Sequence, residues 1–142
     1  MKNLFLIFLG IVMGLNSNAQ SKEWLSKGWQ IDSNSMREVL KTQLETQSNY
    51  ATLTESERVL ALQTAMNKIA SIVVYYAQDG TYHSETSKGK KVGTWTADFE
   101  KQLLTVIIES KSKNYSIKTL TANRLVLLTE NGQELIFKPN LN

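Results

Sequence analysis

Residues 77–98 read AQDGTYHSETSKGKKVGTWTAD, and this stretch decides the fold. Its first glycine, Gly80, closes a segment that suits a three-residue hairpin loop, with the glycine in the left-handed conformation. Such a loop pairs Tyr76 with Tyr82 on one face of the hairpin. The start of the stretch is therefore predicted to be the corner of an antiparallel sheet.

The other glycines of the stretch support the same interpretation. Lys88-Gly89 marks a second corner, and Gly93 lies inside the strand that follows, where a glycine indicates a bend or a close backbone approach. A phosphate-binding loop needs glycines that open a helix. These glycines open strands, so the stretch is not predicted to hold phosphate.

The alternation of apolar and polar residues continues on both sides of this corner, with turn residues between short segments. It predicts seven strands after Ser71: Ile72–Ala77, Thr81–Thr86, Lys91–Ala97, Leu103–Glu109, Tyr115–Leu120, Arg124–Thr129 and Glu134–Lys138. Connections of a few residues are too short for parallel crossovers, so consecutive strands must be antiparallel neighbours.

A further short strand is predicted at Trp29–Ile31, which brings the number to eight. The expected fold is mainly β, an eight-stranded antiparallel up-and-down barrel that closes on itself and removes both exposed edges. The interior of such a barrel is filled by side chains or holds one small ligand.

Two helices are predicted between the first and second strands, over residues 35–47 and 55–70 within an insertion spanning about 34–70. Ser35 with Glu38, and Thr54 with Glu57, each have the spacing of a capping box. Apolar residues then recur at helical spacing in both segments. The pair is long enough to lie across one mouth of the barrel.

The amino terminus has the pattern of a signal peptide. Lys2 precedes an uncharged apolar run, Leu4–Leu15, that is too short to span a bilayer, and small residues Ser17 and Ala19 follow it. We expect residues 1–19 to be a signal peptide cleaved after Ala19. An uncleaved anchor is the alternative.

The composition is that of an ordinary globular domain, and we expect one domain over residues 20–142. The formal net charge of +3 is too weak to argue for nucleic acid. The chain has no cysteine, so it has no disulfides and no residue that could carry a lipoprotein anchor. The expected location is outside the cytoplasm, periplasmic or secreted, with no integral membrane association once the signal is removed.

The second half of the chain resembles small bacterial lipocalin-like domains. The resemblance rests on an ordered series: Asp79-Gly-Thr-Tyr82, Gly93-Thr-Trp95, Lys113–Ile117, Leu120–Leu127 and Glu134–Phe137. It implies a lipocalin-type β-barrel, export from the cytoplasm and binding of a small apolar molecule. It names no ligand.

Few residues are arranged for catalysis. His83 is the single histidine, and neither a metal set nor a nucleophile motif accompanies it, so a strand histidine is the stronger interpretation. Glu55 and Glu57 are explained by helix capping, and Glu109 and Glu130 by the ends of strands. We therefore expect no enzyme, no metal and no cofactor.

Lysines gather at the strand connections, namely Lys88, Lys90, Lys91, Lys111 and Lys113. They either solvate the hairpin tips or attract an acidic lipid headgroup or a polyanion. The first role is the more common one.

The aromatic residues of the strands are the best candidates for a ligand site: Tyr76, Tyr82, Trp95, Tyr115 and Phe137. If they point inward, they either line a pocket or fill the barrel as core. The first functional hypothesis is thus a non-enzymatic barrel that binds a small hydrophobic or amphipathic ligand. The alternative is a filled barrel that serves as a scaffold for macromolecular interaction through its loops or helical pair, with the protein partner unknown.

Overall fold

Eight antiparallel strands form one closed barrel in chain order. The structure is a computed structural model and describes residues 18–141. The strands are β1 (Gly28–Ile31), β2 (Val73–Tyr76), β3 (Thr81–Thr86), β4 (Gly89–Asp98), β5 (Leu103–Ile108), β6 (Lys111–Leu120), β7 (Leu125–Leu128) and β8 (Glu134–Pro139). Each strand pairs with the next, and β1 pairs with β8, where Gln30 lies opposite Lys138. The predicted up-and-down barrel is confirmed.

The turn at Gly80 has the predicted form. Gly80 has a φ of 91°, and Tyr76 lies directly opposite Tyr82 in the β2–β3 ladder. The indole Nε1 of Trp95 donates a hydrogen bond of 2.7 Å to the carbonyl of Ala77, so the β2–β3 turn is also hydrogen-bonded to β4.

Two strands begin at least two residues earlier than predicted. β4 begins at Gly89 rather than Lys91, and β6 begins at Lys111 rather than Tyr115. The connection between β5 and β6 is therefore only two residues, Glu109 and Ser110, and both have positive φ values of 53° and 66°. Neither residue is a glycine or an asparagine, so the sequence carries no ordinary signal for this tight turn.

Two helices, α2 (Arg37–Glu45) and α3 (Glu55–Ala70), separate β1 from β2, with a short 3-10 turn, η1 (Tyr50–Thr52), between them. The capping box at Thr54 is confirmed, because its hydroxyl accepts from the Glu57 N–H and the Glu57 carboxylate accepts from the Thr54 N–H. The box at Ser35 is wrong: α2 begins two residues later than predicted. Ser35 instead donates its N–H and hydroxyl to the carboxylate of Asp32.

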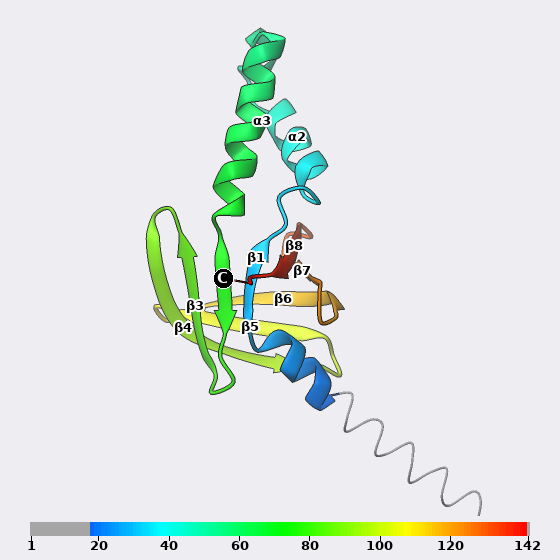
Figure 1. Cartoon of the computed structure of the whole chain (residues 1–142), viewed down its shortest axis with the longest axis vertical. Coiled ribbons are helices and arrows are strands. Elements are labelled where there is room, and N and C mark those ends of the chain that lie inside the picture. The colour runs from blue at the N-terminus through cyan, green and yellow to red at the C-terminus, as the bar shows by residue number, and fades with distance from the viewer. Residues whose placement is uncertain (1–17, 142) are drawn as a thin grey trace, which may run out of the picture.

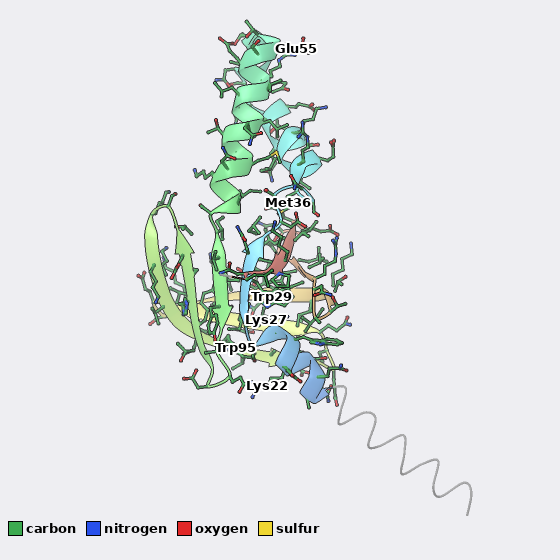
Figure 2. The ribbon with its side chains drawn as sticks, in the orientation of Figure 1. Lys22, Lys27, Trp29, Met36, Glu55 and Trp95 are labelled. Atoms are coloured by element: carbon green, nitrogen blue, oxygen red, sulfur yellow. The ribbon has the colours of Figure 1, made fainter. Side chains whose placement is uncertain are left out.

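The helical pair stands out from one end of the barrel instead of lying across its mouth (Figure 1). Met36, at the base of the pair, is buried in the barrel core, whereas Glu55 lies at the far tip (Figure 2). Only the proximal part of the pair therefore contributes to the core.

A helix over residues 18–25, which the sequence patterns did not predict, lies at the opposite end of the molecule from α2 and α3 (Figure 1). Its Leu25 is fully buried, and the carbonyl of Leu25 accepts a hydrogen bond of 3.1 Å from the indole of Trp29. Most of the predicted signal peptide, residues 1–17, lies outside the described residues.

Candidate functional site

An open cavity of about 510 Å³ lies over the inner faces of β3 to β6. Its lining residues are Tyr82, Ser84, Thr86, Lys88, Gly89, Lys91, Val106, Ile108, Glu109, Lys111, Lys113 and Tyr115. Strand directions alternate, so the β3–β4 and β5–β6 turns lie at the same end of the barrel as the helical insertion between β1 and β2. The cavity opens at that end.

Strand alternation explains which side chains reach the cavity. Side chains two residues apart share one face of a strand. On β6 the inward series is Lys111, Lys113, Tyr115 and Ile117, and the register places Lys111 opposite Ile108. Charged and aromatic side chains thus follow one another along a single inner face.

The inner part of the cavity is aromatic and apolar. Tyr82 and Val106 are buried, and Tyr115 is half-buried beside them. Below this floor the barrel is packed: the ring centroids of Tyr76 and Tyr82 are 5.4 Å apart, and those of Tyr76 and Trp95 are 5.7 Å apart. The barrel is therefore closed by core side chains in one half and open in the other.

The five aromatic residues proposed as a ligand site separate into two groups. Tyr82 and Tyr115 line the cavity. Tyr76, Trp95 and Phe137 are buried members of the hydrophobic core. Trp95 lies toward the end that carries the helix of Lys22 (Figure 2). A ligand-binding role for all five stays a prediction.

The tyrosine hydroxyls at the floor are held in their neutral form. Burial raises the pKa of Tyr82 to about 12, with a smaller contribution from the nearby Tyr115. Burial, and then the carboxylate of Glu130, raises the pKa of Tyr115. Burial also raises the pKa of Tyr76 well above its usual value. Protonated hydroxyls can donate hydrogen bonds, so Tyr82 and Tyr115 supply donors to the floor.

Four lysines line the cavity, and we call them the cavity lysines: Lys88, Lys91, Lys111 and Lys113. One acidic residue, Glu109, lines it with them. Within residues 18–141 the structure shows one salt bridge, Lys118–Glu134, and it involves none of the cavity lysines. The cavity is therefore strongly cationic.

The sequence patterns do not predict that Lys111 and Lys113 point into the barrel. The prediction placed both residues in a loop before Tyr115, and loop lysines have no defined face. Residues 111–114 are all polar, so the apolar–polar alternation that marks a half-buried strand begins only at Tyr115.

Of the other chemical candidates, His83 lies away from the cavity, whereas Glu130 lies close enough to Tyr115 to raise its pKa. His83 faces the outside of the barrel, where its ring stacks on Tyr75 at a centroid distance of 5.0 Å. In the described part of the chain, no group of three or more histidine, cysteine, aspartate or glutamate side chains is placed to hold a metal ion. Glu130 accepts a hydrogen bond from the side chain of Asn114.

Between residues 18 and 141, no helix is both long enough and apolar enough to cross a membrane.

No family model matches this chain, and none of the curated proteins matches it. Among solved structures, the chain is similar to a DUF4847 family protein from Bacteroides vulgatus, at 15% identity and a TM-score of 0.55, covering 84% of this chain and 96% of that one. A lipocalin-like protein from Bacteroides uniformis matches at 14% identity and a TM-score of 0.49, covering 82% of this chain and 99% of that one. The second likeness is too distant to carry an argument. The barrel topology and the first likeness together show the fold: this chain is a mainly β protein with a closed, eight-stranded up-and-down β-barrel.

Proposed function

We propose that this chain is an exported, non-enzymatic lipocalin-like protein that binds a small amphipathic molecule in the open half of its barrel. One observation carries the proposal: a cavity of about 510 Å³ with an aromatic and apolar floor and a polar mouth. Small-molecule sites typically measure about 300–1,000 Å³ and combine an apolar lining with a few polar groups. The cavity has that size and that composition.

A neutral, environment-sensitive probe tests ligand binding without any contribution from charge. N-Phenyl-1-naphthylamine would be titrated into the chain that begins at Gln20, and its emission is expected to rise on binding. Ser84→Phe places a ring in the cavity, because Ser84 faces inward opposite Lys91. We expect this variant to bind the probe at least ~10-fold more weakly, the loss that follows from about 1.4 kcal/mol of binding energy.

Thr94→Phe is the matched control, because Thr94 is exposed on β4 and does not line the cavity. It should bind the probe as the parent chain does. Both variants would be checked for an unchanged melting temperature. Absence of probe binding by the parent chain, or equal binding by both variants, would contradict the proposal.

Export has its own test. The full chain would be produced in a Gram-negative host, and the protein outside the cytoplasm would be sequenced from its amino terminus. We expect it to begin at Gln20. An exported protein that still begins at Met1 would favour the uncleaved anchor.

The non-enzymatic part of the proposal rests on the position of His83, which stacks on Tyr75 outside the barrel. The cavity lining contains no histidine. Screening the chain and its His83→Ala variant against esters, glycosides and phosphoesters should give no turnover. Turnover that His83→Ala abolishes would overturn this part.

Macromolecular interaction through the helical pair is the second candidate function. Val59 and Leu60 are 65% and 67% exposed on α3, far more than ordinary apolar residues of a packed helix. A photo-crosslinking amino acid at position 60, compared with the same group at exposed Glu100, would capture one defined partner in the producing cell if this candidate holds. Equal, diffuse labelling at both positions would count against it.

A further inference from the structure

We propose that the cavity selects an amphipathic anion, with a carboxylate or phosphate head among the cavity lysines and an apolar body on the floor formed by Tyr82, Val106 and Tyr115. This inference rests on the proposed function, and it adds the charge of the ligand and the direction in which it binds. Four separate observations carry it: the register of the lysines, their excess charge, their depth and the neighbouring hydroxyls.

The register places lysines on two sides of the cavity. Lys91 on β4 lies opposite Ser84, and Lys113 on β6 lies opposite Val106. Both partners line the cavity, so both lysine side chains are directed over it. An anion between β4 and β6 would be contacted from both sides.

The charge of the cavity is unbalanced. Four lysines face one glutamate, an excess as large as the formal net charge of the whole chain, +3. Like charges held near one another repel, and a bound anion removes that repulsion. Glu130, outside the cavity lining, is the other carboxylate that acts on a cavity residue, because it raises the pKa of Tyr115. The lysines still outnumber the nearby carboxylates, so the mouth is positively charged.

The depth of the side chains gives the ligand a direction. Along β6, Lys111 and Lys113 are exposed, Tyr115 is half-buried and Ile117 is buried. Along β3, Thr86 is exposed and Tyr82 is buried. Charge and exposure both decrease inward, so the head group lies at the mouth and the apolar body lies inside.

Hydroxyl groups line both the mouth and the floor of the cavity. Ser84 and Thr86 line the cavity on β3, and the neutral hydroxyls of Tyr82 and Tyr115 lie deeper. Each can donate a hydrogen bond to an anionic oxygen. The site therefore offers directional donors besides its net charge.

A charge series at constant chain length tests the inference. Dodecanoate, dodecyl phosphate, dodecanol and dodecyltrimethylammonium would each displace N-phenyl-1-naphthylamine from the protein. We expect the two anions to displace the probe at ~10-fold lower concentration than the neutral and cationic amphiphiles at low salt, an advantage that shrinks as salt is added.

The key variant is the triple substitution Lys91→Gln, Lys111→Gln and Lys113→Gln. It should lose the preference for anions and retain binding of the neutral probe. The matched control is Lys90→Gln, Lys101→Gln and Lys138→Gln, which makes the same change in net charge at residues that do not line the cavity. The control should retain the preference.

The outcomes separate the two proposals. If the neutral probe binds and all four amphiphiles displace it equally, the anion preference is overturned and ligand binding stands. If the probe does not bind, the proposed function fails. A loss of preference in the control triple variant would overturn the role of the cavity lysines.

Inorganic phosphate distinguishes a free anion from an amphiphile's head group. Phosphate alone should displace dodecyl phosphate at least ~10-fold less effectively than dodecanoate does, because it makes no contact with the floor. Equal displacement would overturn the amphipathic class and leave a simple anion site.

Discussion

At the scale of single residues, Gly93 determines how closely β4 and β5 approach. It lies on the inner face opposite Tyr82, and a Cβ added to it would lie 2.0 Å from the carbonyl oxygen of Ile107. No side chain fits there unless the strands separate. The close backbone approach predicted for this glycine is confirmed.

Gly93→Ala should therefore be strongly destabilising. We expect a loss of about 2–4 kcal/mol in the free energy of unfolding, the range of strongly disruptive core changes. Urea unfolding followed by tryptophan emission measures it. Gly28→Ala is the control, because its added Cβ meets neighbours at 3.5 Å, an ordinary contact distance. Equal losses in both variants would contradict the steric explanation.

Tyr82 should make the free energy of unfolding decrease at high pH. Its folded pKa is raised to about 12, above the value of about 10 in an unfolded chain. Stability from the neutral hydroxyl is thus fully present below about pH 10 and is lost as the pH rises toward 12. In the Tyr82→Phe variant, which has no hydroxyl to ionise, the free energy of unfolding should fall by about 2 kcal/mol less over this pH range.

Urea unfolding at a series of pH values would measure the effect of Tyr82, with Tyr50→Phe as the control. Tyr50 lies in η1 of the helical insertion and packs under Arg58, so it leaves the barrel interior unchanged. Identical pH profiles for Tyr82→Phe and the parent chain would show that the Tyr82 hydroxyl makes no such contribution.

At the scale of elements, the sequence determined the strand order but not the strand ends. Connections of only a few residues predict the antiparallel order, because parallel neighbours need much longer crossovers. Glycines at two of these connections, Gly80 and Gly89, mark turns. The β5–β6 turn contains no glycine or asparagine, so the sequence patterns predict a loop over Lys111 and Lys113. The core aromatics were predictable from their alternation. The inward direction of two cavity lysines, Lys111 and Lys113, was not predictable, because it depends on the position of the unmarked β5–β6 turn.

Ser110 occupies a backbone conformation that suits glycine, with a φ of 66°. Ser110→Gly should stabilise the protein by about 1 kcal/mol, because non-glycine residues are strained in the left-handed region. Thermal unfolding would show a higher melting temperature. Ser112→Gly, on the adjacent strand, is the control and should be destabilising, since glycine weakens a strand interior. A lower melting temperature for Ser110→Gly would show that the turn is not strained.

Helix α3 depends on its cap. Thr54→Ala removes one of the two bonds of the capping box and should cost about 1 kcal/mol locally. Since α3 stands out from the barrel, the effect should appear as ~5-fold faster amide hydrogen exchange in its first turns. Ser35→Ala should leave α2 unaffected, because the Ser35 side chain bonds to Asp32 and does not cap the helix. Faster exchange in α2 of Ser35→Ala would contradict this assignment.

At the scale of the whole molecule, the two ends of the barrel are packed differently. One end is packed, with Trp29 and Leu25 fully buried. The other end contains the open cavity and the base of the helical pair. The proposed binding site and the packed core therefore lie at different ends of the barrel axis, so changes to the cavity lysines should leave the packed end intact.

Residues 20–25 directly follow the predicted signal peptide, yet their Leu25 belongs to the hydrophobic core of the barrel. A chain that begins at Gln20 keeps Leu25 in the core and the bond from Trp29 to its carbonyl. A chain that begins at Lys27 loses both, and we expect it to be less stable by about 3–5 kcal/mol, the cost of a deleted core side chain and an unpaired buried donor. Leu25→Ala within the longer chain should lose about 2–4 kcal/mol. Urea unfolding of the three proteins would measure these differences, and equal stability of the two truncated chains would show that the helix over residues 18–25 does not support the barrel.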